Sequence, residues 1–193
     1  MSRIWGVLLA LLLITVLAPS SIAQLHVEDA FPNIPSYGFA LDLKDPYDGT
    51  DRLFVAEKSG RISTFWNDPS ATTVHTFLDL TGKVYDFIGA GFYSLAFHPD
   101  YENNGYLYVI YAADAPVRTV LERYTVSAAD SNVADTLSVQ TIFELPKTNL
   151  LHFGATLEFA ADGYLYVSLG DDGVPAHGQD RTNFHGSILR LDV

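Results

Sequence analysis

The sequence ADGYLYVSLGDDG, at residues 161–173, carries the clearest signal of secondary structure in the chain. It places a run of alternating aromatic and aliphatic residues between two turns rich in Gly and Asp, which is the pattern of a short β-strand. The same pattern occurs twice more, as ENNGYLYVIYAAD at 102–114 and as YDGTDRLFVAEKSG at 47–60. The chain therefore contains an internal repeat of one strand-based unit.

The repeat has the length of a propeller blade. Leu53, Leu107 and Leu165 occupy the same place in the three copies, which gives a period of 54 and then 58 residues. Periods of roughly 40 to 60 residues with four strands per unit are typical of β-propellers. We therefore predict an all-β protein, a β-propeller of which about three four-stranded blades are present. The strands are expected at 37–43, 52–56, 60–65, 72–78, 92–97, 106–111, 120–126, 137–143, 156–159, 164–169 and 187–193.

The number of blades bears on how the ring closes. Propellers have about four to eight blades, whereas about three fit between Gln24 and Val193. An open arc of blades would leave sheet faces and strand edges uncovered. We therefore expect residues 24–193 to be the N-terminal part of a longer propeller. The alternative is a half-propeller that closes as a homodimer.

The first 23 residues have the features of a secretory signal peptide. Arg3 is their one cation, the apolar run Ile4–Leu17 spans about 14 residues, and small residues lead to Ala23. A membrane-spanning helix needs roughly 20 apolar residues. We predict cleavage that leaves Gln24 at the mature N-terminus. The mature protein is then secreted or periplasmic and is not held at the membrane. An uncleaved anchor is the alternative.

Composition excludes several classes of function. Eleven Lys and Arg against 23 Asp and Glu give a net charge of −12, which repels nucleic acid. The absence of cysteine rules out disulfides, zinc–thiolate sites and thiol nucleophiles. The sequence also lacks a G-x-S-x-G elbow, a Walker loop and a G-x-G-x-x-G motif, so it gives no support for a hydrolase triad or a nucleotide site.

Of the six histidines, His152 has the setting of a functional residue. It precedes the first strand pattern of the third unit, and Asp171 follows the next strand. Two antiparallel strands joined by a tight turn bring these two positions together, and a carboxylate on one imidazole nitrogen makes the other a general base. A loop histidine bonded to a turn aspartate is the alternative. His75 is expected on a strand surface or in packing, and His98 in a turn.

The segment 171–185 could also hold a metal ion. Oxygen-rich loops suit calcium, and mixtures of His and Asp suit zinc. The spacings match neither an EF-hand nor an H-E-x-x-H motif, so we assign no metal ligands from the sequence. The residues concerned are Asp171, Asp172, His177, Asp180 and His185.

Three separated motifs resemble the soluble glucose/sorbosone dehydrogenases, which include aldose sugar dehydrogenases. They are DRLFVAEKSGRI at 51–62, LAFHPDYENNGYLYV at 95–109, and the region from His152 through GYLYVSLGDDG to GSILRLDV at 186–193. The three motifs occur along the chain in the same order as in the family, and the resemblance covers nearly the whole mature chain. The resemblance implies a six-bladed propeller that uses pyrroloquinoline quinone (PQQ).

The resemblance also implies roles for individual residues. His152 matches the catalytic histidine, which lies against the cofactor and takes the proton of the sugar C1 hydroxyl while a hydride passes to the quinone. Asp171 matches the carboxylate that orients this histidine. The partners implied are a sugar substrate, an external electron acceptor and Ca²⁺, whose ligands come mostly from later blades. The enzymes of this family work in the periplasm or outside the cell.

Three stretches depart from the family pattern. GAGFYS at 89–94 stands where a Gln or Glu is usual, and residues 153–156 lack the usual Arg after the histidine. Ser187 replaces a common Lys. Two other functions therefore stay open. One is a non-catalytic binding propeller of the same superfamily, similar to hedgehog-interacting-type proteins, with a protein or glycan ligand. The other is a metal-dependent hydrolase or lactonase.

Overall fold

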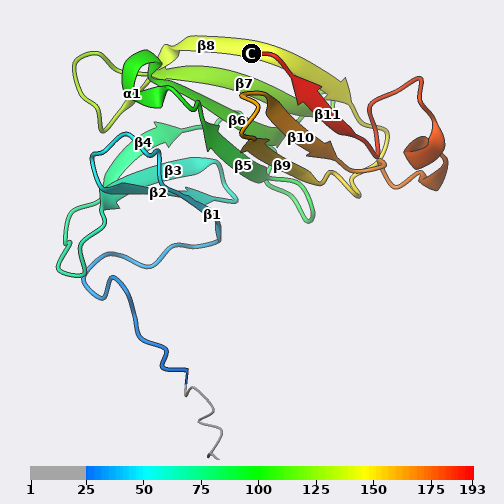
Figure 1. Ribbon diagram of the computed structural model, residues 1–193. Helices are drawn as coiled ribbons and strands as arrows, with labels where there is room; N and C mark the ends of the chain where they lie inside the picture. The colour runs from blue at the N-terminus through cyan, green and yellow to red at the C-terminus, as the bar shows by residue number, and fades with distance from the viewer. Residues whose placement is uncertain (1–24) are drawn as a thin grey trace, which may run out of the picture.

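The computed structural model describes residues 25–193, which form three antiparallel sheets (Figure 1). The predicted signal segment Met1–Ala23 lies outside the described residues. The strand orders are β1-β2-β3-β4, β5-β6-β7-β8 and β11-β10-β9. The strands are β1 Ala40–Lys44, β2 Arg52–Glu57, β3 Arg61–Trp66, β4 His75–Asp79, β5 Phe92–Phe97, β6 Tyr106–Ala113, β7 Arg118–Val126, β8 Ala134–Pro146, β9 Ala155–Phe159, β10 Leu165–Leu169 and β11 Ile188–Leu191.

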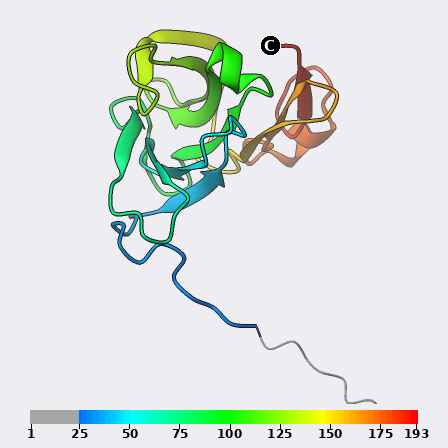
Figure 2. The ribbon, with the colours of Figure 1, turned by 60° about the vertical axis from the view of Figure 1, so that its left-hand side comes forward.

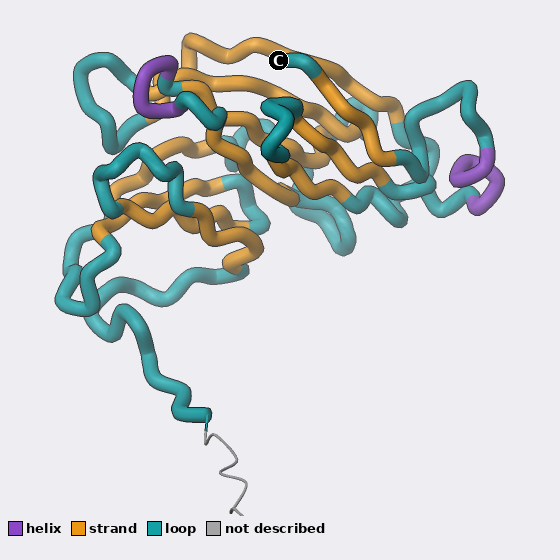
Figure 3. Tube along the Cα trace, in the orientation of Figure 1, coloured by secondary structure: helices purple, strands orange, loops and turns teal. Residues whose placement is uncertain are grey.

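The repeat predicted from the sequence is confirmed. Leu53, Leu107 and Leu165 lie in β2, β6 and β10, the second strand of each unit. The three strands expected in the third unit, at 156–159, 164–169 and 187–193, are present as β9, β10 and β11. The connection 170–187, between β10 and β11, forms turns and the short 3₁₀ helix η1 (Pro175–Gln179) (Figure 3).

The second sheet lies between the other two (Figure 2). Alternate residues of β6 point to opposite faces of the sheet. Leu107 and Val109 belong to a core shared with the first sheet, whereas Tyr108 and Ile110 belong to a core shared with the third. Both faces are buried, which explains why β6 is apolar throughout. This face-to-face packing of successive sheets is that of propeller blades.

The first strands of the three units lie next to one another. Asp42 of β1 accepts hydrogen bonds from the Ser94 hydroxyl (3.0 Å) and from the backbone N–H of Leu95 (3.2 Å) in β5. The same hydroxyl accepts a bond from the N–H of Leu157 in β9 (3.2 Å). Ser94 is buried and therefore ties all three sheets together at their inner edge.

Replacing Ser94 by Ala should destabilise the chain by about 1–3 kcal/mol. The substitution leaves the buried N–H of Leu157 and the carboxylate of Asp42 each without one partner. Urea unfolding measures the change. Ser70→Ala is the control, because Ser70 is exposed and bonds only within its own turn, to Asp68. Equal costs for the two variants would contradict the role of Ser94 between the sheets.

The remaining helix, α1 (Tyr101–Asn104), is a single turn. It follows His98, whose Nδ1 accepts the backbone N–H of Asp100 at 3.0 Å, so the predicted turn role of His98 is confirmed. His75 begins β4 and is exposed, as expected of a surface histidine. None of the helices within residues 25–193 has the length and apolar character needed to cross a bilayer.

Candidate functional site

The connection from β8 to β9 and the end of β10 lie at the end of the sheets opposite to α1 (Figure 1). His152 is in the connection from β8 to β9, and Asp171 follows β10. β9 and β10 pair antiparallel with Ala155 opposite Leu169, so the start of one strand lies beside the end of the other. Nδ1 of His152 is 2.7 Å from Oδ1 of Asp171. The proximity predicted from the sequence is confirmed.

The charge of Asp171 fixes how this pair is protonated. The hydrogen bond from His152 holds the pKa of the Asp171 carboxyl below its ordinary value, and the backbone N–H of Gly173 donates a second bond at 3.0 Å. An ionised carboxylate accepts only, so Nδ1 carries the proton and Nε2 of a neutral His152 carries a lone pair. The side chain of His152 is 62% exposed, which leaves Nε2 open to a substrate.

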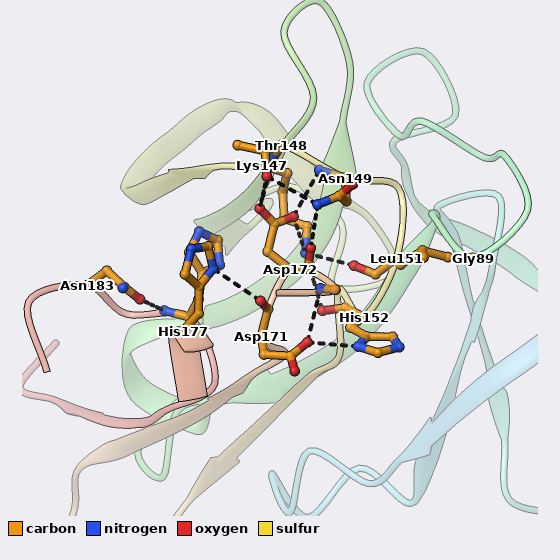
Figure 4. A network of polar contacts seen from close by, with 12 residues as sticks. Gly89, Lys147, Thr148, Asn149, Leu151, His152, Asp171, Asp172, His177 and Asn183 are labelled. Atoms are coloured by element: carbon orange, nitrogen blue, oxygen red, sulfur yellow. Dashed lines mark hydrogen bonds and ion pairs between the residues drawn. The ribbon is translucent and has the colours of Figure 1, made fainter. Parts of the chain in front are cut away.

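A buried ion pair supports the segment that carries His152 (Figure 4). Nζ of Lys147 is 3.2 Å from Oδ1 of Asp172, and the two side chains are 1% and 0% exposed. The same ammonium donates to the backbone carbonyls of Leu151 (3.1 Å) and His152 (3.2 Å). It also lies 4.4 Å from the centroid of the Phe153 ring, a cation–π distance. Lys147 therefore holds the backbone on both sides of the candidate base.

Asp172 completes this support from the other side. Its carboxylate accepts bonds from the backbone N–H of Thr148 (2.9 Å), the Thr148 hydroxyl (2.6 Å) and the N–H of Asn149 (3.1 Å). Burial opposes ionisation, but the hydrogen bonds outweigh it and lower the pKa of Asp172 to about 2. The carboxylate therefore stays charged, although no water reaches it.

Stability should depend on pH through Asp172. Its folded pKa of about 2 lies below the ordinary value of 3.8, so its contribution is full above about pH 3.8 and is lost as the pH falls toward 2. Urea unfolding between pH 5 and pH 2 tests this. The wild-type chain should lose more stability over this window than Asp172→Asn, which cannot titrate. Parallel pH profiles for the two chains would contradict the assignment.

Sequence reasoning missed Lys147, Thr148 and Asn149. In the sequence these three residues form a polar run between a predicted strand and the apolar residues 150–151. Such a run ordinarily indicates an exposed loop, so it does not predict a buried ion pair. The stretch 89–94, which departs from the family, contributes Tyr93. The Tyr93 ring stacks on Phe153 with centroids 5.8 Å apart, and its hydroxyl donates to the carbonyl of Gly89. Burial raises the pKa of Tyr93, so it stays protonated and packs beside the site.

The fold brings together three of the residues considered as metal ligands. Asp172, His177 and His185 each offer one ligand atom, and these atoms lie within 4.8 Å of one another. Asp180 is not part of this group, and its carboxylate accepts hydrogen bonds from Thr182 and Asn183.

The described residues could supply the base of a PQQ site, but not the cationic groups that would bind the carboxylates of PQQ. PQQ carries three carboxylates, which require cationic or N–H partners. His152 is exposed, and its Nε2 is the ring nitrogen that is not bonded to Asp171. The Lys147 ammonium is buried on Asp172, and Lys58 pairs with Asp86. These groups are therefore not free to take the cofactor carboxylates.

Comparison with known proteins identifies the family. The profile of the glucose/sorbosone dehydrogenases matches residues 43–193. Hedgehog-interacting protein of mouse and of man is 33% identical over 162 residues, covering 76% of this chain and 23% of that protein. Quinoprotein glucose dehydrogenase B of Acinetobacter calcoaceticus is 26% identical over 156 residues, covering 65% and 32%. The chain thus spans about a quarter to a third of the length of these relatives.

Solved structures show the same fold. A Thermus thermophilus oxidoreductase described as a glucose dehydrogenase superposes with a TM-score of 0.66 at 27% identity, covering 79% of this chain and 43% of that one. The PQQ-bound aldose sugar dehydrogenase of Streptomyces coelicolor gives 0.67 at 23% identity, covering 82% and 46%. These neighbours confirm the propeller fold predicted from the repeat. The chain therefore belongs to the glucose/sorbosone dehydrogenase family.

Proposed function

We propose that this chain forms the proton-accepting part of an exported, PQQ-dependent aldose dehydrogenase. The single observation that carries the proposal is the 2.7 Å contact between His152 Nδ1 and Asp171, at a position open to solvent. Membership of the glucose/sorbosone dehydrogenase family supports it. The predicted signal segment Met1–Ala23 gives the exported location, outside the cell or in the periplasm.

The reaction is the two-electron oxidation of an aldose at C1. The C1–H bond breaks with loss of a hydride, the O–H bond breaks with loss of a proton, and the C1–O bond becomes the carbonyl of a lactone. Bound PQQ, with Ca²⁺, supplies the acceptor for the hydride. An external electron acceptor then removes the two electrons, so that the cycle can repeat.

The residues of this chain handle the proton. Nε2 of His152 accepts it from the C1 hydroxyl, and the charged Asp171 compensates the positive imidazolium that results. Asp171 also keeps the ring in the tautomer that presents a lone pair at Nε2. Lys147 and Asp172 hold the backbone of the His152 segment, so the base does not have to be ordered when the substrate binds.

A non-catalytic binding propeller is the second candidate. It is favoured by the 33% identity with hedgehog-interacting protein, which exceeds the 26% identity with the quinoprotein dehydrogenase. In that case His152 and Asp171 would be a surface pair with a structural role. The two candidates differ in one property, the binding of the quinone.

Titration with PQQ in the presence of Ca²⁺ separates the candidates. It is carried out on the mature chain and on a longer protein that contains it, and is followed by quinone absorbance and by dye reduction with a panel of aldoses. The proposal expects saturable quinone binding and aldose-dependent dye reduction by the longer protein. Activity of the mature chain alone would indicate that it closes into an active oligomer. A folded longer protein that binds no quinone would contradict the dehydrogenase and favour the binding propeller.

A further inference from the structure

A cluster of three side chains lies in the connection between β10 and β11, behind the His152–Asp171 pair. Asp172 stands at its start, His177 in η1, and His185 shortly before β11. One ligand atom from each lies within 4.8 Å of the others. The proposed oxidation of a sugar makes no use of the two histidines.

His177 is held in the form that binds metals. Its Nδ1 lies 3.1 Å from the backbone carbonyl of Asp171, as Figure 4 shows. A carbonyl oxygen only accepts, so Nδ1 carries the proton and the lone pair of a neutral ring is on Nε2. A histidine that ligates a metal usually donates its other N–H to a carbonyl or carboxylate in this way, which fixes the ring for coordination. His177 is half-buried, which leaves a route for an ion from solvent.

His185 has a ring nitrogen that the protein does not satisfy. Its side chain is buried, with 8% exposure of the residue, and its Nδ1 has no hydrogen-bond partner among the described residues. A buried polar atom without a partner costs about 1–3 kcal/mol, so a ligand at this nitrogen would stabilise the folded chain. The ring stacks on that of His177, with centroids 5.0 Å apart and planes at 17°. His185 thus brings an imidazole with an unsatisfied nitrogen to the same cluster as His177.

Asp172 supplies the anionic member. Its carboxylate is buried and is held by Thr148, Asn149 and Lys147. A metal ion can bind this carboxylate only if one of these contacts is broken. The contact with Lys147 is the best candidate, because its ammonium would still donate to the carbonyls of Leu151 and His152. The ammonium and the ion would also repel each other. We therefore expect the affinity of an adaptable site, below that of a closed structural zinc centre.

From this geometry we propose that Asp172, His177 and His185 bind a divalent transition metal of the zinc class. Two imidazole nitrogens and one carboxylate oxygen suit Zn²⁺, Co²⁺ or Ni²⁺, whereas Ca²⁺ and Mg²⁺ prefer sets of oxygen ligands. Three protein ligands leave one position of a tetrahedral ion to water. Zinc–nitrogen bonds of about 2.0–2.1 Å require the ligand atoms to draw together, which a connection made of turns allows. The site stands independently of the dehydrogenase proposal.

Zinc titration of the mature chain, purified without a histidine tag, tests the site. ZnCl₂ should raise the melting temperature in a saturable way, because a ligand that binds only the folded state stabilises it. Co²⁺ should give the visible absorption of a tetrahedral ion. His177→Gln should weaken zinc binding by more than the roughly 10- to 100-fold that loss of a supporting contact costs. The chain with His75→Gln is the control, because His75 is exposed on β4.

His185→Gln should weaken zinc binding to a similar extent. His177→Gln carries the test if the buried substitution at His185 prevents folding, because His177 is half-buried at the surface. CaCl₂ at the same concentration should leave the melting temperature of the wild-type chain unchanged. The proposal is overturned if the wild-type chain shows no zinc-dependent shift, or if His177→Gln keeps the wild-type affinity. None of these measurements involves the quinone, so their failure leaves the dehydrogenase proposal untouched.

Discussion

Replacing His152 by Ala is expected to lower aldose oxidation by a PQQ-loaded protein containing this chain by roughly 10²- to 10⁴-fold. The substitution removes the nitrogen that accepts the C1 hydroxyl proton, whereas the hydride acceptor is unchanged. Quinone affinity should stay largely intact, because the resemblance to the dehydrogenase family implies that most contacts to the cofactor come from later blades. The loss should therefore appear in kcat more than in KM. Steady-state dye reduction measures both constants, and quinone absorbance measures binding.

His75→Ala is the matched control, since this histidine is exposed on β4, away from the site. It should turn over at the wild-type rate. Asp171→Asn should reduce kcat less than His152→Ala does, because Asn leaves the base in place but stabilises the wrong tautomer. Wild-type turnover by His152→Ala would remove this residue from the mechanism.

Lys147→Met should destabilise the chain by about 3–5 kcal/mol, the cost of breaking a buried ion pair by removing one partner. The variant leaves the carboxylate of Asp172 buried without its cation, and the carbonyls of Leu151 and His152 each lose a donor. Methionine has a similar shape, so the loss of charge dominates over the loss of volume. The midpoint of urea unfolding measures the change.

Arg61→Met is the control for this prediction. Arg61 pairs with Asp79 at 3.6 Å, and the two side chains are 49% and 44% exposed, so the pair lies at the surface. Surface pairs contribute about 0–1 kcal/mol. The double variant Lys147→Met with Asp172→Asn should recover part of the lost stability, because the unpaired charge is gone. A cost for Lys147→Met as small as that of the surface control would show that the buried pair does not hold the segment.

Much of the fold could be predicted from the sequence because strands carry their information locally. The runs around Leu53, Leu107 and Leu165 alternate or stay apolar with the period of a strand, and the turns between them contain Gly and Asp. The third unit was harder. Its connection 170–187 has turn residues but no periodicity, so the sequence does not reveal that it forms η1.

Some contacts of the candidate site could be predicted from the sequence and others could not. His152 and Asp171 could be placed together because a tight turn between β9 and β10 fixes their register. The ion pair of Lys147 with Asp172 could not, because it depends on how two irregular segments fold back on each other. The need for Gly170 was equally hidden. A Cβ there would lie 1.8 Å from the carbonyl oxygen of His152, a contact visible only in three dimensions.

The tautomer of His152 tests directly whether Asp171 prepares this histidine as a base. Long-range ¹H–¹⁵N NMR of the mature chain, recorded at about pH 8, reports which ring nitrogen carries the proton. The geometry predicts a protonated Nδ1 and an unprotonated Nε2, with this preference weakened in Asp171→Asn. A proton on Nε2 in the wild-type chain, or the same mixture of tautomers in both chains, would contradict it.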